Sequence, residues 1–106
     1  MNDTFVVLSA CATAEEAERI ATTAVDLHLA ACVQILPQMR SVYRWQGKVE
    51  SAAEHLLLFK TTAAKFELLR SKIEELHSYE VPEILALPAA AGSEKYLAWL
   101  KDAVNA

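Results

Sequence analysis

One β-rich stretch, Leu29 to Lys60, constrains the fold more than any other part of the sequence. Two largely apolar runs flank the pair Gln46-Gly47, and an X-Gly pair in that setting is typical of a hairpin with a two-residue turn. With this turn, Trp45 faces Lys48 across the hairpin. Each arm exceeds the usual strand of about 5–6 residues. A hairpin of this length must therefore extend beyond a domain of 106 residues.

The remaining patterns predict two further strands and three helices. Short apolar runs predict buried strands at Phe5 to Ala10 and Ile84 to Leu87. Apolar residues at helical spacing predict helices at Ala14 to Leu29, Ala63 to His77, and after Ser93. The order β-α-β-β-α-β-α indicates an α+β fold, the ferredoxin-like split βαβ sandwich with an extra C-terminal helix, in one domain over residues 1–106. Both crossover helices should lie on one face of an antiparallel sheet, which leaves the other face apolar and open.

Local signals refine these boundaries. Thr13 to Glu16 has the spacing of a capping box at the start of the first helix. Thr61-Thr62 offers an N-cap for the second helix, and Ser93 offers one for the last. Pro37 has no N–H for the ladder, so it marks an edge, a bulge or a bend in the first arm of the hairpin.

The composition bounds the partners. Apolar residues make up 54% of the chain, above the usual range of about 45–50%, which favours an oligomer. The formal net charge is −4 and no basic run is present, so we expect no nucleic-acid partner. No apolar run approaches the roughly 20 residues that span a bilayer, and the first residues carry no secretion-signal pattern. Two separated cysteines do not make a disulfide framework, so a reducing cytoplasm is expected.

No motif of a catalytic centre is present. The sequence has no nucleophile elbow, no HExxH and no paired carboxylates, and its two glycines leave no room for a glycine-rich phosphate loop. We therefore expect no enzyme activity, no catalytic residue and no obligatory cofactor.

Two residues are candidate metal ligands. Cys11 lies where the first strand meets a helix N-terminus, which favours a reactive or metal-binding thiol, although a small buried core residue also fits. His77 ends the second helix beside Tyr79 and Glu80, so it can bind a transition metal or can cap helix carbonyls. Cys32 fits a core position.

A second candidate site involves Lys60 and Glu83. Lys60 closes one strand and Glu83 precedes the last strand, so the two can meet in one cleft as an ion pair or as the polar floor of a ligand site. A rim salt bridge of little energetic value is the alternative.

Several blocks of the sequence together resemble the CutA family of divalent-cation tolerance proteins. They are LAACVQILP (29–37), SVYRWQGKVE (41–50), LFKTT (58–62), HSYEVPEI (77–84) and YLAWL (96–100). The resemblance implies a ferredoxin-like subunit in a homotrimer, in which Trp45 and Tyr43 of the long hairpin lie at the trimer interface. It also implies a protein that responds to metal ions and is not an enzyme. The family's proposed ligands align with Ser9, Leu76 and His77, so this sequence keeps only one of them, and Cys11 lies on the same strand face as Ser9.

Two interpretations of function follow, and both stay open at the level of sequence. The first is a trimeric protein that binds Cu(II) or a similar divalent ion weakly through His77 and Cys11. The second, by analogy with the PII-like trimeric sensors, is a protein that binds a small anionic ligand in a subunit-interface cleft. The candidate residues of that cleft are Lys60, Glu83, Tyr43 and Cys32. A scaffold without a ligand is a third possibility.

Overall fold

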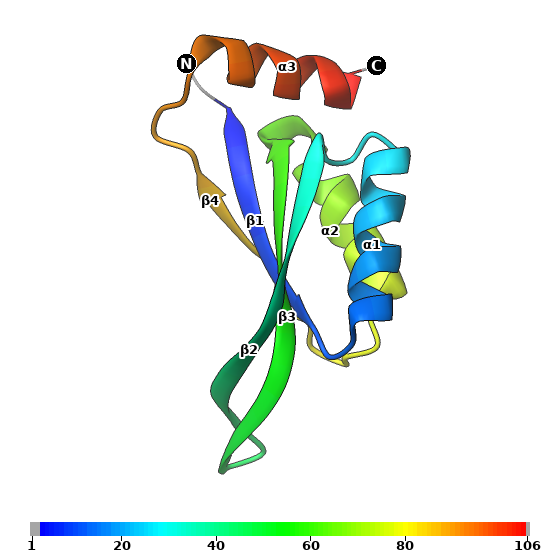
Figure 1. The fold of residues 1–106 in the computed structure, drawn as a ribbon, viewed down its shortest axis with the longest axis vertical. Helices are drawn as coiled ribbons and strands as arrows, with labels where there is room; N and C mark the ends of the chain where they lie inside the picture. Colours follow the sequence, from blue (N-terminus) through cyan, green and yellow to red (C-terminus); the bar gives the residue numbers. More distant parts are fainter. Residues whose placement is uncertain (1–2, 106) are drawn as a thin grey trace.

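The computed structural model describes residues 3–105. In chain order, the elements are β1 (Thr4–Cys11), α1 (Ala14–Asp26), β2 (Cys32–Trp45), β3 (Lys48–Thr62), the 3-10 turn η1 (Ala63–Lys65), α2 (Phe66–Leu76), β4 (Leu85–Pro88) and α3 (Glu94–Asn105). The strands form one antiparallel sheet in the order β2-β3-β1-β4, and α1 and α2 lie together on one face of it (Figure 1). This confirms the ferredoxin-like arrangement with an extra C-terminal helix. Within the described residues, no helix is long and apolar enough to cross a bilayer.

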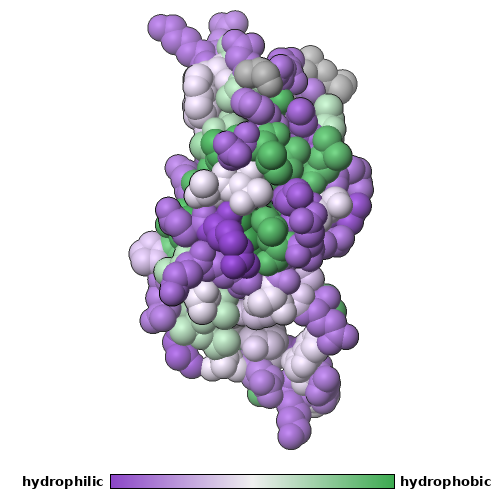
Figure 2. Space-filling model, turned by 90° about the vertical axis from the view of Figure 1, so that its right-hand side faces the viewer, coloured by the Kyte–Doolittle hydropathy of each residue, from purple (hydrophilic) through white to green (hydrophobic). Residues whose placement is uncertain are grey.

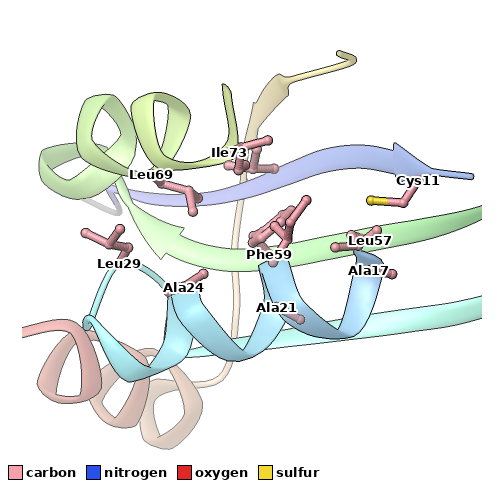
Figure 3. Packing of buried hydrophobic residues seen from close by; sticks show 12 residues of the cluster. Cys11, Ala17, Ala21, Ala24, Leu29, Leu57, Phe59, Leu69 and Ile73 are labelled. Atoms are coloured by element: carbon pink, nitrogen blue, oxygen red, sulfur yellow. The ribbon is translucent and has the colours of Figure 1, made fainter. Parts of the chain in front are cut away.

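The core lies between the sheet and the two helices. Small residues on α1 let that helix approach the sheet closely, and Leu69 and Ile73 contribute from α2 (Figure 3). Phe59 of β3 is fully buried at the centre of this cluster. Burying one side chain of this size contributes about 1.5–3 kcal/mol. On the outer side of α1, hydrophilic residues cover much of the surface and hydrophobic ones form separate patches (Figure 2).

α1 ends earlier than the predicted boundary at Leu29. Its N-terminus is capped as predicted, because the Glu16 N–H donates to Thr13 Oγ1 at 3.1 Å. Its last helical residue is Asp26, because His28 takes a left-handed φ of 60°. The Leu29 N–H then donates to the carbonyl of Ala24 at 2.9 Å, which closes the helix.

α2 begins later than predicted. Thr61 and Thr62 do not cap it, because both still pair with β1 as part of β3. Thr61 Oγ1 instead donates to the carbonyl of Leu29 at 2.6 Å. One 3-10 turn follows before α2 starts at Phe66. At its other end, the helix stops at Leu76, and the next residue has extended backbone.

The β2-β3 hairpin has the predicted register, with Trp45 paired to Lys48. Its turn is built by positive φ angles of 50° at Gln46 and 80° at Gly47, which suit the twist of the flanking strands. The register shifts between Leu36 and Met39, so a bulge lies at Pro37. The hairpin extends well below the body of the molecule (Figure 1). With the hairpin included, the longest dimension of the molecule is 44 Å.

The sheet face opposite α1 and α2 is apolar and open, as predicted. Leu85 and Leu87 of β4 pair with Leu8 and Val6 of β1, whose side chains alternate with the buried Val7. The two leucines are 59% and 50% exposed. α3 crosses one end of the sheet and buries Leu100 and Val104 there, against Ala31 (Figure 1).

The predicted last helix also begins as expected. Ser93 Oγ accepts a hydrogen bond from the Tyr96 N–H at 3.2 Å, which caps α3.

Candidate functional site

Three potential metal ligands converge at one end of the core. Cys11 ends β1, Glu16 lies in the first turn of α1, and His77 follows α2 directly. Their ligand atoms all lie within 4.8 Å of one another, and all three residues are buried. We call these residues the three-donor cluster. Sequence analysis named Cys11 and His77 as candidates and missed Glu16.

A hydrogen bond of its carboxylate accounts for the place of Glu16 in this cluster. Its N–H donates to the capping residue Thr13, whereas its carboxylate makes a contact outside the first turn. Glu16 Oε2 accepts a hydrogen bond from the Ser78 N–H at 2.7 Å. The first turn of α1 is thereby joined to the segment that follows α2. The capping-box pattern accounted for Glu16 locally and gave no signal of this second contact.

Both ring nitrogens of His77 have partners. Nδ1 accepts a hydrogen bond from the Tyr79 N–H at 3.0 Å. The proton of the neutral ring is therefore on Nε2, which donates to the carbonyl of Ala10 at 2.7 Å. The same Nε2 lies 3.8 Å from Cys11 Sγ. His77 thus joins the end of α2 to the end of β1. Its ring does not cap a helix carbonyl; the carbonyl of Leu76 accepts a hydrogen bond from Arg19 Nη2 at 3.1 Å.

The Cys11 thiol is held in its neutral form. Burial, followed by the nearby charges of Glu16 and Glu54, raises the pKa of Cys11 to about 12, with Arg19 acting weakly in the opposite direction. Because the thiolate is the metal ligand, an ion that binds here must displace the thiol proton. The donor set of thiol, imidazole and carboxylate suits a borderline transition metal, with an open coordination position.

The other aligned ligand positions contribute no imidazole or thiol. Ser9 lies on the same face of β1 as Cys11 and is 1% exposed. Among the described residues, its Oγ has no hydrogen-bond partner. Leu76 is partly buried against the main core.

Beside the cluster, a groove of about 780 Å³ lies between the hairpin and the segment after α2. Its lining residues are Ala10, Ser41, Val42, Tyr43, Trp45, Glu54, Ser78, Tyr79, Glu80, Val81, Pro82 and Glu83. The predicted candidates Tyr43, Trp45 and Glu83 all line it. Sequence analysis missed Glu54 and Tyr79, which are joined by a hydrogen bond from the Tyr79 hydroxyl to Glu54 Oε2 at 2.6 Å.

Within the subunit, Lys60 and Glu83 do not meet. β3 and β4 both run antiparallel to β1, so they run parallel to each other. The end of β3, which carries Lys60, is therefore level with the end of β4, whereas Glu83 precedes its start. Lys60 Nζ donates to Gln34 Oε1 instead.

Cys32 lies with Lys60 and not with the groove. The two residues pair across β2 and β3. Cys32 Sγ lies 3.5 Å from the Tyr96 hydroxyl, and this contact, with partial burial, raises the pKa of Tyr96 to about 12. The four cleft candidates of the sequence thus separate into two pairs, Lys60 with Cys32 and Tyr43 with Glu83.

Comparisons with known proteins all point to one family. The model of the CutA1 divalent ion tolerance protein matches residues 5–103. A divalent-cation tolerance protein CutA of Thermus thermophilus is 48% identical over 92% of this chain and 94% of its own length. The chloroplastic protein CutA of Arabidopsis thaliana is 45% identical over 86% of this chain, which spans 50% of that protein. The crystal structure of CutA from Xylella fastidiosa superposes with a TM-score of 0.95 at 37% identity, covering 97% of this chain and 99% of the other.

Proposed function

Because the chain belongs to the CutA1 divalent ion tolerance protein family, we propose that it binds divalent metal ions, Cu(II) foremost, in the three-donor cluster. The observation that carries this proposal is the convergence of a thiol, an imidazole and a carboxylate within 4.8 Å. Copper stands highest in the affinity order of the divalent first-row metals, so it is the ion expected to bind best. We propose no catalysed reaction, since the family is described by tolerance to divalent ions.

The affinity should be modest. His77 must give up a hydrogen bond to Tyr79 or to Ala10 before a nitrogen can ligate. Cys11 must lose its proton, whose pKa is raised to about 12. These competing interactions reduce the net free energy of binding, and three protein ligands are fewer than the roughly four of a tight structural zinc site. Zinc binding is expected to be weaker than copper binding, because zinc stands below copper in the affinity order of the divalent metals.

A copper titration at neutral pH tests the site. His77→Gln should weaken Cu(II) binding by about tenfold or more, since even the loss of an outer-sphere partner of a ligand costs about 10–100-fold. Cys11→Ser and Glu16→Gln should each have smaller effects. His28→Asn is the matched control, because it removes an exposed histidine whose Nδ1 contacts the carbonyl of Ala103, remote from the cluster. If His77→Gln binds copper as tightly as His28→Asn does, the three-donor cluster is not the copper site.

We also propose that the protein is a homotrimer. The stoichiometry comes from the family resemblance, and two surfaces support an assembly. Tyr43 and Trp45 near the hairpin tip are 42% and 40% exposed. The open face of the sheet exposes the leucines of β4. Apolar surfaces of this kind are typical of interaction sites.

Sedimentation equilibrium tests this assembly. The wild type should sediment as a trimer at micromolar concentration. Trp45→Ala should raise the trimer dissociation constant at least tenfold, because a buried aromatic anchor often costs about 2 kcal/mol or more when truncated. Leu68→Ala, which truncates an exposed apolar residue of α2 away from the hairpin, is the control. A stable monomeric wild type contradicts the proposal.

A further inference from the structure

The groove beside the hairpin carries a charge pattern that the metal proposal does not use. Three of its lining residues are carboxylates, Glu54, Glu80 and Glu83. None of the described lining residues is a lysine, an arginine or a histidine. Its volume of about 780 Å³ lies within the roughly 300–1,000 Å³ of ordinary small-ligand sites. The negative charges of these carboxylates repel an anion from the groove and attract a cation to it.

Glu54 gives the strongest indication of a missing cationic partner. This residue is 7% exposed, and carboxylates are almost never buried to this extent without pairing. Its one hydrogen bond within the described part of the chain comes from the neutral hydroxyl of Tyr79. Among residues 3–105, the ion pairs join side chains of α2 only, so no cation neutralises Glu54. A buried carboxylate in an open groove is a ready counter-ion for a ligand.

The rest of the lining indicates which cation fits. Tyr43, Trp45 and Tyr79 place three aromatic side chains around the groove. Aromatic faces attract ammonium groups through cation–π interactions and pack well against methylene chains. Val42, Val81 and Pro82 add apolar surface. A bare metal ion, which needs several oxygen or nitrogen ligands, gains nothing from such walls.

We propose that this groove binds an organic ammonium ion of the polyamine class, with one ammonium group paired to Glu54. The alkyl chain lies along the aromatic side chains, and a second ammonium group is neutralised by Glu80 and Glu83 at the exposed rim. Figure 1 shows the segment after α2 beside the point where the hairpin leaves the sheet, which is where these two walls meet. The proposed site shares no ligand residue with the three-donor cluster, but the two are electrostatically coupled, because the charge of Glu54 also acts on Cys11.

Spermidine is the probe, with succinate as the anionic counterpart. Titration calorimetry at low ionic strength should detect binding of spermidine and none of succinate. Trp45 lines the groove, so spermidine should also change its fluorescence; the variant Trp99→Phe leaves it as the sole tryptophan. Glu54→Gln should weaken spermidine binding by about tenfold or more, because hydrogen bonds to charged groups are worth more than neutral ones. Glu18→Gln, which removes an equal charge from an exposed position on α1, should bind as the wild type does.

Glu54 is buried, so a second variant protects the test against misfolding. The double variant Glu80→Gln/Glu83→Gln changes only exposed rim residues and should weaken spermidine binding several-fold. The proposal is overturned if the double variant, Glu54→Gln and Glu18→Gln all bind spermidine with equal affinity. It is also overturned if the wild type binds succinate more tightly than spermidine. If spermidine does not bind but Glu54→Gln shifts the assembly equilibrium, the groove holds a cationic side chain of a second copy, and the small-ligand proposal is also overturned.

Discussion

The three-donor cluster and the groove beside the hairpin are neighbours, but they differ in whether their polar groups already have partners within the protein. Ala10 lines the groove and also accepts the hydrogen bond of His77, so a single strand end separates them. In the cluster, His77 and Glu16 already have protein partners, and Cys11 holds its proton. In the groove, the charge of Glu54 has no cationic partner among residues 3–105. A ligand in the cluster must therefore displace internal hydrogen bonds and a proton, whereas a cation in the groove can pair with Glu54 without displacing a protein cation from it.

The largest expected effect is on the reactivity of Cys11. It tests whether the cluster is closed to solvent, as the comparison with the groove requires. Cys11 is fully buried and its pKa is raised to about 12, so little thiolate exists at pH 8. In the variant Cys32→Ser, alkylation by iodoacetamide should be slower than that of a free thiol by roughly a hundredfold or more. Mass spectrometry of timed samples measures it. A Cys11 thiol that reacts as quickly as free cysteine contradicts the closed cluster.

The pH dependence of copper binding sharpens the same contrast. Below the raised pKa of Cys11, each ion bound by this thiol displaces one proton. Copper affinity should therefore rise with pH, by about tenfold per unit for one proton released. Titrations at three pH values between 6 and 8 should show a shallower dependence for Cys11→Ser. Identical slopes for the two proteins would exclude the thiol as a ligand.

The hydrogen bond between Tyr79 and Glu54 gives a stability test of the groove. Tyr79→Phe removes the one described donor to this buried carboxylate, which should lower the free energy of unfolding by about 1–3 kcal/mol. Urea unfolding at neutral pH measures the change. Tyr43→Phe is the control, because Tyr43 is exposed and lines the same groove. Equal losses in the two variants would mean that Glu54 is already solvated.

The smallest effect is expected at Ser9. Its buried hydroxyl has no partner among the described residues, so Ser9→Ala should leave stability unchanged or raise it by up to about 1 kcal/mol. Thermal unfolding measures it. Thr61→Val is the contrasting variant, since the Thr61 hydroxyl donates to Leu29, and it should destabilise the protein. A destabilised Ser9→Ala protein would show that this hydroxyl has a partner such as a bound water.

Sequence analysis was most successful where local chemistry decides the structure. The turn at Gln46-Gly47 and the cap at Ser93 depend on neighbouring residues, and both are confirmed. Of the alternatives left open for Pro37, the structure shows a bulge in an edge strand. Cap positions set by distant contacts were not predictable: Thr61 bonds to Leu29 and so remains in the strand.

The site residues follow the same division. Glu16 was assigned a local role in a helix cap, and its contact with Ser78 spans 62 positions of the chain. Glu54 and Tyr79 lie on separate elements and meet only in the folded protein. Lys60 and Glu83, expected to meet as an ion pair or as the polar floor of a ligand site, do not meet within the subunit. The direction of β4 relative to β3 places them at different levels of the sheet.

The bulge at Pro37 also governs how β2 can be extended by another chain. β2 is an edge strand of the sheet, and such an edge offers free N–H and C=O groups to any incoming strand. Pro37 has no N–H, and the register shift between Leu36 and Met39 bends the strand there. The edge is thus divided into two segments with different alignments. An added strand can pair continuously on only one side of the bulge, which restricts unlimited edge-to-edge aggregation.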